Sequence, residues 1–207
     1  MANGEAWKWR SDLNGAFSIK QVRLDLELAS VESDNNDFIF GWNSWPPPKV
    51  NYLLWRALIG KIASRVGLVR RGIPLLDCSC PRCGMNAEDP DYIFFNCIWS
   101  RSVWWNMLIW MRINFPVEIS NIKDLFGFIQ NRPGSSKWKR VVYTVALATV
   151  WWIWKARNEM VFERRFIPVG IIVEQVKEDA YLWISNRSKL IQASRENWRM
   201  FNISVML

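Results

Sequence analysis

Residues 141–154 have the sequence VVYTVALATVWWIW, which is the longest apolar run in the chain. The polar interruptions of this run are Tyr143, Thr144 and Thr149. A helix that crosses a membrane needs about 20 predominantly apolar residues, so this shorter run predicts a helix buried in a protein core. We expect it to form the longest helix of the chain, beginning at Ser135 or Ser136 and ending near Phe162.

Helical patterns on both sides of this run are bounded by capping residues, glycines or prolines. Ser18 and Gln21 have the spacing of a capping box, which predicts a helix that reaches about Ala29. Trp7 and Trp9 alternate with a lysine, as in a short strand. Further helices are expected over residues 49–59, 65–71, 100–111, 120–130 and 168–186, and around residues 92–95. The sequence therefore predicts a mainly α-helical fold, a single helical domain with a cysteine loop between helical groups.

The composition supports one domain, which we divide into three segments. The chain has 207 residues, and half of them are hydrophobic, which is enough apolar matter for a core. Residues 1–48 hold the N-terminal strand and helix and a Pro-rich stretch. Residues 49–115 hold the cysteine-containing core, and residues 116–207 hold the long C-terminal helices, which we expect to pack on the same domain.

The absence of histidine narrows the chemistry that the chain can perform. With no histidine in the sequence, Ser-His-Asp and Cys-His catalytic arrangements are excluded, and so are metal sites with histidine ligands. The sequence also lacks a Gly-rich phosphate loop and a G-x-S-x-G motif. Its 19 carboxylates are scattered along the chain and suggest no two-metal pair. We therefore expect the protein not to be an enzyme.

Three of the four cysteines lie within six residues, in the stretch DCSCPRCG at positions 77–84. Cys80 and Cys83 form a C-x-x-C turn, which places two thiolates on one tetrahedral ion, and Gly84 lets that turn close tightly. Cys97 is a third candidate ligand from the helix that follows. Cys78, two residues before Cys80, is a candidate fourth. Four thiolates would complete a closed structural Zn²⁺ site that contributes to folding.

Short stretches along the chain carry a resemblance to a known family. They are WKW at 7–9, GAFSIK at 15–20, WPPPKV at 45–50, LWR at 54–56, RRGI at 70–73, CPRCG at 80–84, DYIFFNC at 91–97 and WKARN at 154–158. In this order the sequence resembles the reverse-transcriptase zinc-binding domain of plant LINE-type, non-LTR retrotransposon polyproteins. The last stretch resembles the segment that follows this domain. The resemblance implies zinc binding, and nucleic-acid binding in support of a reverse-transcription machinery.

The sequence departs from the family pattern at Tyr92. In that pattern a C-x-x-C pair is followed by a histidine, four residues and a cysteine, and Tyr92 occupies the histidine position. Tyrosine is a poor zinc ligand, so the site carried over keeps Cys80, Cys83 and Cys97. Two alternatives follow. Either Cys78 completes an all-cysteine centre, or the site has decayed and the region packs without metal, with its cysteines as small core residues.

Basic residues flank the cysteines in a chain whose net charge is +8. The residues expected to contact nucleic-acid phosphates are Arg65, Arg70, Arg71 and Arg82, with Arg56 and Lys61 beside them. Trp55 is a neighbour that could stack on unpaired bases. The simpler alternative is a solvated helix face whose arginine stems cover apolar surface. A second group is expected mainly to solvate the ends of the long helix: Lys137, Lys139, Arg140, Lys155, Arg157, Arg164 and Arg165.

The 15 tryptophans favour core packing, or an interface with a neighbouring domain, over base stacking. This holds most clearly for tryptophans in apolar helices: Trp104, Trp105, Trp110, Trp151, Trp152 and Trp154. A Trp-rich surface of this kind suits a reverse-transcriptase domain or another protein as partner.

Together these patterns predict a non-catalytic, nucleic-acid-binding accessory domain of a retrotransposon reverse transcriptase, with RNA or a single-stranded template as partner. The alternative is a host-retained protein–protein interaction module or a decaying retroelement fragment that binds no nucleic acid. A membrane-associated protein built around residues 141–154 ranks last. Because the N-terminal residues lack the pattern of a signal peptide, we expect an intracellular protein, nuclear or cytoplasmic.

Overall fold

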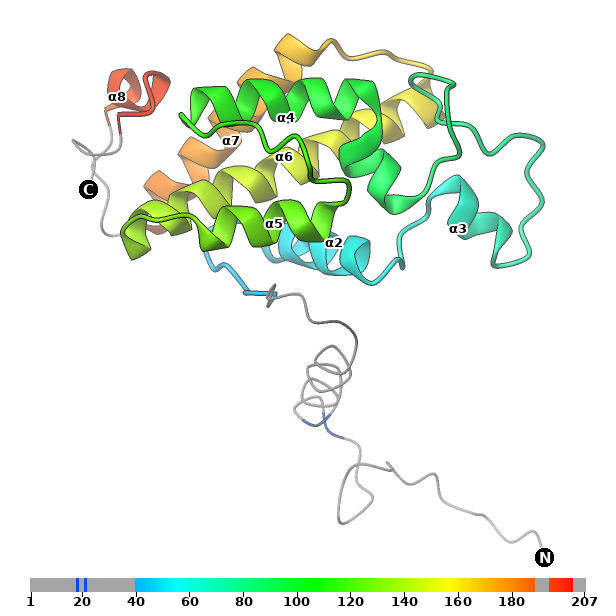
Figure 1. Ribbon diagram of the computed structural model, residues 1–207, viewed down its shortest axis with the longest axis horizontal. Coiled ribbons are helices and arrows are strands. Elements are labelled where there is room, and N and C mark those ends of the chain that lie inside the picture. Colours follow the sequence, from blue (N-terminus) through cyan, green and yellow to red (C-terminus); the bar gives the residue numbers. More distant parts are fainter. Residues whose placement is uncertain (1–17, 19–20, 22–39, 189–193, 203–207) are drawn as a thin grey trace, which may run out of the picture. The chain divides into compact units, whose positions relative to one another are not determined.

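The apolar run lies in the middle of helix α6, Ser136–Glu163, which is the longest helix of the computed structural model (Figure 1). Residues 141–150 are all buried, so this part of α6 is enclosed on every side. The hydroxyls of Thr144 and Thr149 donate hydrogen bonds of 2.7 and 2.9 Å to the carbonyls four residues earlier. Their polarity is thus satisfied within the helix. No helix of the described residues is long and apolar enough to cross a membrane.

The structure describes Ser18, Gln21 and residues 40–188 and 194–202. The chain divides into two compact units, Met1–Asp37 and Phe38–Leu207. In the first unit the Ser18 hydroxyl accepts a hydrogen bond of 3.1 Å from the Gln21 N–H, as the capping box predicts. The rest of that predicted helix, and the predicted strand at Trp7 and Trp9, lie outside the described residues.

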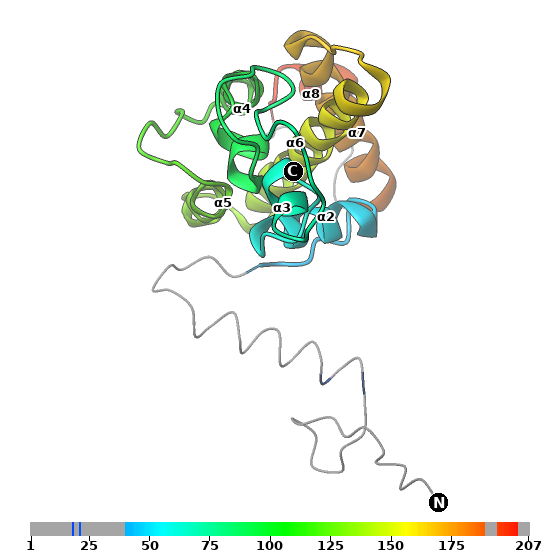
Figure 2. The same cartoon turned by 90° about the vertical axis from the view of Figure 1, so that its right-hand side faces the viewer.

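The second unit is mainly helical, which confirms the predicted fold class. Besides α6, its helices are α2 (Pro48–Leu58), α3 (Arg65–Val69), the π-helical turn η1 (Tyr92–Asn96), α4 (Ile98–Trp110), α5 (Ile122–Asn131), α7 (Val169–Arg187) and α8 (Arg195–Arg199). Helices α2, α4, α5, α7 and η1 all pack on α6, which lies between them (Figure 2). A long loop joins α3 to η1 and carries the C-x-x-C pair, so the cysteine loop lies between helical groups as predicted.

Helices α3 and α6 begin at the predicted capping residues, whereas α4 begins at Ile98 rather than at Ser100. Ser64 and Ser135 each accept a hydrogen bond of 3.1 Å from the N–H three residues later, at the starts of α3 and α6. Helix α5 differs, because Asn121 rather than Ser120 caps it. Helix α8 was not expected from the sequence. Its Trp198 ring packs edge-on against Trp110 of α4, with centroids 5.1 Å apart, so a distant contact holds this short helix.

The tryptophans divide between the core and the surface. Trp104 is fully buried and its indole N–H donates a hydrogen bond of 2.7 Å to the Phe94 carbonyl, which fixes η1 against α4. Trp152 is also buried, as predicted for the apolar helices. Trp105, in contrast, is 52% exposed on the outer side of α4. Core packing therefore explains part of the tryptophan content and leaves some rings on the surface.

Candidate metal centre

The cysteine loop, residues 77–91, is closed by short-range backbone contacts. Ser79 and Ala87 form an isolated antiparallel bridge, and the Cys80 N–H donates to the Asn86 carbonyl at 2.8 Å. The Gly84 N–H donates to the Cys80 carbonyl, also at 2.8 Å. Gly84 has a φ of 68°, a conformation that glycine adopts at the least cost. The C-x-x-C-G stretch therefore forms the tight turn that its spacing predicts.

Three of the four cysteines meet at one point. The sulfur atoms of Cys80, Cys83 and Cys97 all lie within 4.8 Å of one another, and those of Cys80 and Cys97 are 3.8 Å apart. A tetrahedral zinc ion at about 2.3 Å from each ligand keeps its sulfurs about 3.8 Å apart. The three thiols therefore have the chemistry and approximate spacing of a zinc site. Cys97 directly follows the π-helical turn η1. Its backbone N–H donates to the Tyr92 carbonyl at 2.9 Å, and this bond fixes Cys97 at the end of the turn.

The surroundings of the thiols favour ionisation of Cys97. Its pKa is lowered, first because it accepts a hydrogen bond from the Cys80 thiol and further because the N–H groups of Trp99 and Ser100, in the first turn of α4, donate to it. The pKa of Cys80 is raised by the hydrogen bond that it donates to Cys97 and by its burial. Since the thiolate is the form that binds metal, these hydrogen bonds favour Cys97 as a ligand.

The Tyr92 side chain lies beside one of the three clustered thiols. The Tyr92 hydroxyl lies 3.1 Å from the Cys83 sulfur, and Asn86 donates to the hydroxyl at 3.4 Å. Burial, followed by the hydrogen bond with Cys83, raises the pKa of Tyr92 to about 12, so it stays a neutral phenol at pH 7. Cys78 is not part of the three-thiol group, although its carbonyl accepts a hydrogen bond of 2.7 Å from the Glu88 N–H.

Arg82, expected from the sequence to contact phosphate, faces inward instead. Its guanidinium stacks on the Trp99 ring at 3.4 Å from the centroid and donates to the Ala156 carbonyl of α6 at 2.9 Å. Its Nε and Nη1 atoms are buried without a hydrogen-bond partner. Burial lowers the pKa of Arg82 to about 10, against the opposing effect of the Cys97 and Cys80 thiols, so it stays charged at pH 7. Arg82 therefore places a positive charge beside the metal centre.

Part of the chain is similar to a known protein family. Residues 17–104 match the family model described as zinc-binding in reverse transcriptase. The match contains the cysteine loop, η1 and all three clustered cysteines, and it ends within α4. No curated protein and no solved structure matches the chain.

Contacts from inside and outside the matched segment hold the cysteine loop in place. The Glu88 carboxylate is fully buried and forms an ion pair with Arg157 of α6, whose Nε lies 3.0 Å from Glu88 Oε2. The same carboxylate accepts from the Arg65 N–H at 3.1 Å, and the Glu88 carbonyl accepts from the Val66 N–H at 3.1 Å. Glu88 thus fastens the loop to both α3 and α6. The expectation that Arg157 solvates a helix end was wrong, because its charge is buried against Glu88.

Sequence reasoning missed Glu88 because no motif marks it. Its partner, Arg157, is the arginine of the WKARN stretch and lies 69 residues later in the chain. Nothing in the local pattern links two such distant positions. A helix beyond the matched interval therefore supplies part of the support of the cysteine loop.

The other basic candidates lie along α2 and α3. Lys61, Arg70 and Arg71 are exposed. Arg56 and Arg65 are half-buried: Arg56 Nε donates to the Lys61 carbonyl at 2.9 Å, and Arg65 pairs with Asp77 at 3.2 Å and donates to the Ser79 carbonyl at 2.8 Å. Arg65 therefore supports the cysteine loop, and Arg71, although exposed, donates a hydrogen bond of 2.7 Å to the Ile62 carbonyl. Lys61 and Arg70 lie at the protein surface. Arg56 lies in α2 and Arg65 in α3, the helix that precedes the cysteine loop (Figure 1), and Lys61, Arg70 and Arg71 lie in the segments that follow these helices.

Proposed function

We propose that this chain is a zinc-stabilised, non-catalytic accessory domain of a plant LINE-type retrotransposon reverse transcriptase, and that it binds RNA or a single-stranded template. The match to the zinc-binding family model supports the association with reverse transcriptase. Cys80, Cys83 and Cys97 would hold the ion, which supplies a structural cross-link between the cysteine loop and α4.

Charge segregation is the observation that carries nucleic-acid binding. Residues 38–76, which include α2 and α3, contain six basic residues and no aspartate or glutamate, in a chain whose net charge is +8. The six are Lys49, Arg56, Lys61, Arg65, Arg70 and Arg71. A surface of this kind attracts phosphates and has no carboxylate of its own to repel them. The cysteine loop and its ion would hold α3 at a fixed place, since Arg65 and Glu88 join the two.

A salt series with a charge-reversal variant tests this function. Binding of the purified protein to a single-stranded RNA and to the matched DNA is measured from low to high salt. We expect the logarithm of the affinity to fall linearly with the logarithm of salt, by about 0.7 per phosphate contact on a single strand. The triple variant Lys61→Glu, Arg70→Glu, Arg71→Glu should weaken binding at low salt and flatten this slope.

The matched control reverses three charges elsewhere. Lys123→Glu, Lys137→Glu and Lys139→Glu change the net charge equally and lie in the first turns of α5 and α6, where acidic residues are tolerated. If both triple variants bind alike, attraction to overall charge explains the affinity and the α2–α3 surface has no special role. Absence of binding at low salt would contradict the function itself.

A second candidate function, protein–protein interaction, is favoured by one row of side chains. Ile98, Trp105 and Ile109 lie on the outer side of α4 and are 63%, 52% and 53% exposed. Their spacing places them on one helix face. An interaction module would self-associate through such a face, and Trp105→Lys would then convert an oligomer into a monomer in sedimentation experiments.

A further inference from the structure

The exposed side of α2 carries aromatic rings among its basic residues. Tyr52 and Trp55 stack with ring centroids 5.5 Å apart and planes 30° apart, and the Tyr52 side chain is 51% exposed. The Arg56 guanidinium lies 5.8 Å from the Tyr52 centroid. Lys49, Tyr52 and Arg56 follow one another at the three- and four-residue spacing of one helix face. Charge and ring therefore alternate along this face.

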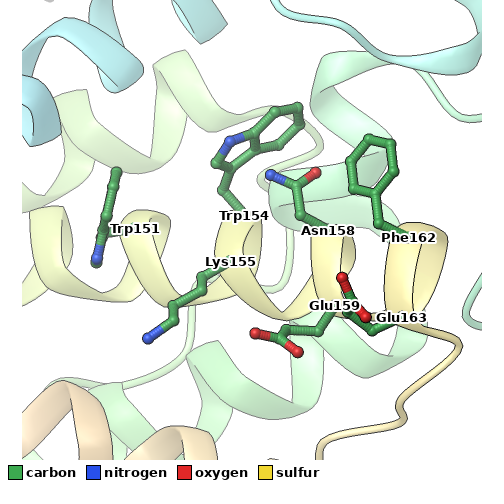
Figure 3. A pocket seen from close by; sticks show the side chains of 7 residues that line it. All are labelled: Trp151, Trp154, Lys155, Asn158, Glu159, Phe162 and Glu163. Carbon is green, nitrogen blue, oxygen red and sulfur yellow. The ribbon is translucent and has the colours of Figure 1, made fainter.

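A third ring continues this surface onto α6. The Lys49 ammonium lies 4.7 Å from the centroid of Trp151, so the start of α2 is directly beside this tryptophan. Trp151 stands at one end of an open groove of about 300 Å³ along α6. Figure 3 shows that Trp154 and Phe162, which also line the groove, project to one side of α6, whereas Lys155 and Glu159 project to the other. The aromatic side of α6 thus extends the row of rings that begins on α2.

We propose that the α2 strip, defined as Lys49, Tyr52, Trp55, Arg56 and Trp151, binds unpaired bases of single-stranded nucleic acid by stacking. The inference rests on the proposed function and adds the part of the ligand that is recognised. An exposed ring stacks on the face of a base, and those faces are accessible only where the strand is unpaired. Every base has such a face, so the strip should bind single strands with little sequence preference.

The charges of the strip fit this ligand better than they fit a protein. Lys49 and Arg56 lie within cation–π distance of the rings, where they can reach the phosphates on either side of a stacked base. Two carboxylates line the groove beyond Trp151, Glu159 and Glu163, and Glu159 is paired with Arg165 at 2.6 Å. An uncharged peptide would leave the cations of α2 without partners.

Three nucleic-acid probes separate base stacking from phosphate binding. They are an oligothymidylate, a strand of the same length that lacks its bases, and the oligothymidylate paired with its complement. We expect the wild-type protein to bind the oligothymidylate more tightly than the other two. Tyr52→Ala should weaken binding to the oligothymidylate by roughly tenfold, because stacking contributes about 1–3 kcal/mol per base, and it should leave the base-free strand and the salt slope unchanged.

Two further variants provide controls. Trp105→Ala removes a ring that is exposed to the same extent, 52%, but lies on α4, and it should leave all three affinities unchanged. Tyr52→Phe keeps the ring and should bind as the wild type does, with far-UV circular dichroism checking the fold of each variant.

Equal wild-type binding to the oligothymidylate and the base-free strand would overturn the stacking inference and leave the proposed function standing. No binding to any probe would overturn both.

Discussion

The middle of α6 is buried throughout, whereas the cysteine loop is buried only at Cys80 and Glu88, and the two regions are held by different means. Along residues 141–150 the interior is apolar, and the hydroxyls of Thr144 and Thr149 bond to their own helix. The cysteine loop instead has charged groups inside, and their partners are far away in the chain: Glu88 pairs with Arg157, 69 residues later, and Arg82 bonds to a carbonyl 74 residues later. Local patterns therefore describe the first region well and the second only in part.

The largest expected effect comes from breaking the buried ion pair of the loop. Arg157→Leu leaves the Glu88 carboxylate buried without its cation and should cost about 3–5 kcal/mol of unfolding free energy, measured by urea denaturation. Arg165→Leu is the matched control, because its pair with Glu159 is exposed and should contribute only about 0–1 kcal/mol. The double variant Glu88→Gln, Arg157→Met should regain much of the loss. An equal cost for the two single variants would contradict the contrast between buried and exposed pairs.

A cavity in the middle of α6 tests the apolar region. Leu147 is fully buried, and Leu147→Ala should cost about 2–5 kcal/mol through lost burial and the cavity that remains. We expect the same loss in the presence of zinc and of a chelator, since α6 bonds to the cysteine loop at Ala156 and Arg157, beyond this region. A loss that depends strongly on zinc would show that the two regions are coupled more closely than their separate contacts indicate.

Removing one clustered thiol tests the cysteine loop in the same way. With free zinc a hundredfold above its dissociation constant, binding should stabilise the wild type by about 2.7 kcal/mol. Cys83→Ser should abolish that zinc-dependent increase in thermal stability, and Cys78→Ser should keep it, because Cys78 lies outside the three-thiol group. Zinc content measured by mass spectrometry of the metal provides an independent check. Loss of zinc from the Cys78 variant would assign the fourth ligand to that residue.

The positive charge of Arg82 should raise the affinity of the three thiolates for the metal without being required for binding. Three thiolates and one zinc ion carry a net negative charge, and the Arg82 guanidinium is buried beside them. Arg82→Gln should lower zinc affinity by roughly 10- to 100-fold, as loss of an outer-shell partner does, in competition with a chromophoric chelator. Arg101→Gln is the control, since Arg101 also lies over aromatic rings, 5.3 Å from the Phe95 centroid, but outside the thiol cluster. Equal affinities would exclude this electrostatic role.

The sequence could predict those features whose causes are local. The apolar run predicted α6. Ser64 and Ser135 predicted the starts of α3 and α6, and the C-x-x-C-G spacing predicted the tight turn. The inward position of Arg82, the role of Glu88 and the existence of α8 depend on contacts with α4 and α6 that form only when the chain is folded. The gathering of Cys97 with Cys80 and Cys83 was expected because Cys97 follows the C-x-x-C pair as a candidate third ligand, and the resemblance to a family implied the same three residues.

The smallest effect is expected at Tyr92, which combines a buried ring with a polar contact to the cysteine loop. Tyr92 is buried, yet its hydroxyl bonds to the Cys83 sulfur, and Tyr92→Phe should cost about 0.5–1.5 kcal/mol at neutral pH. The pKa of Tyr92 is about 12 in the folded protein and 10.0 ordinarily. Between these values the unfolded chain has released this proton and the folded chain still holds it, so stability falls as pH rises. Urea denaturation of both proteins across this range should show the wild type losing stability more steeply than Tyr92→Phe. Parallel losses would mean that the phenol is no more protected from ionisation in the folded state than in the unfolded chain.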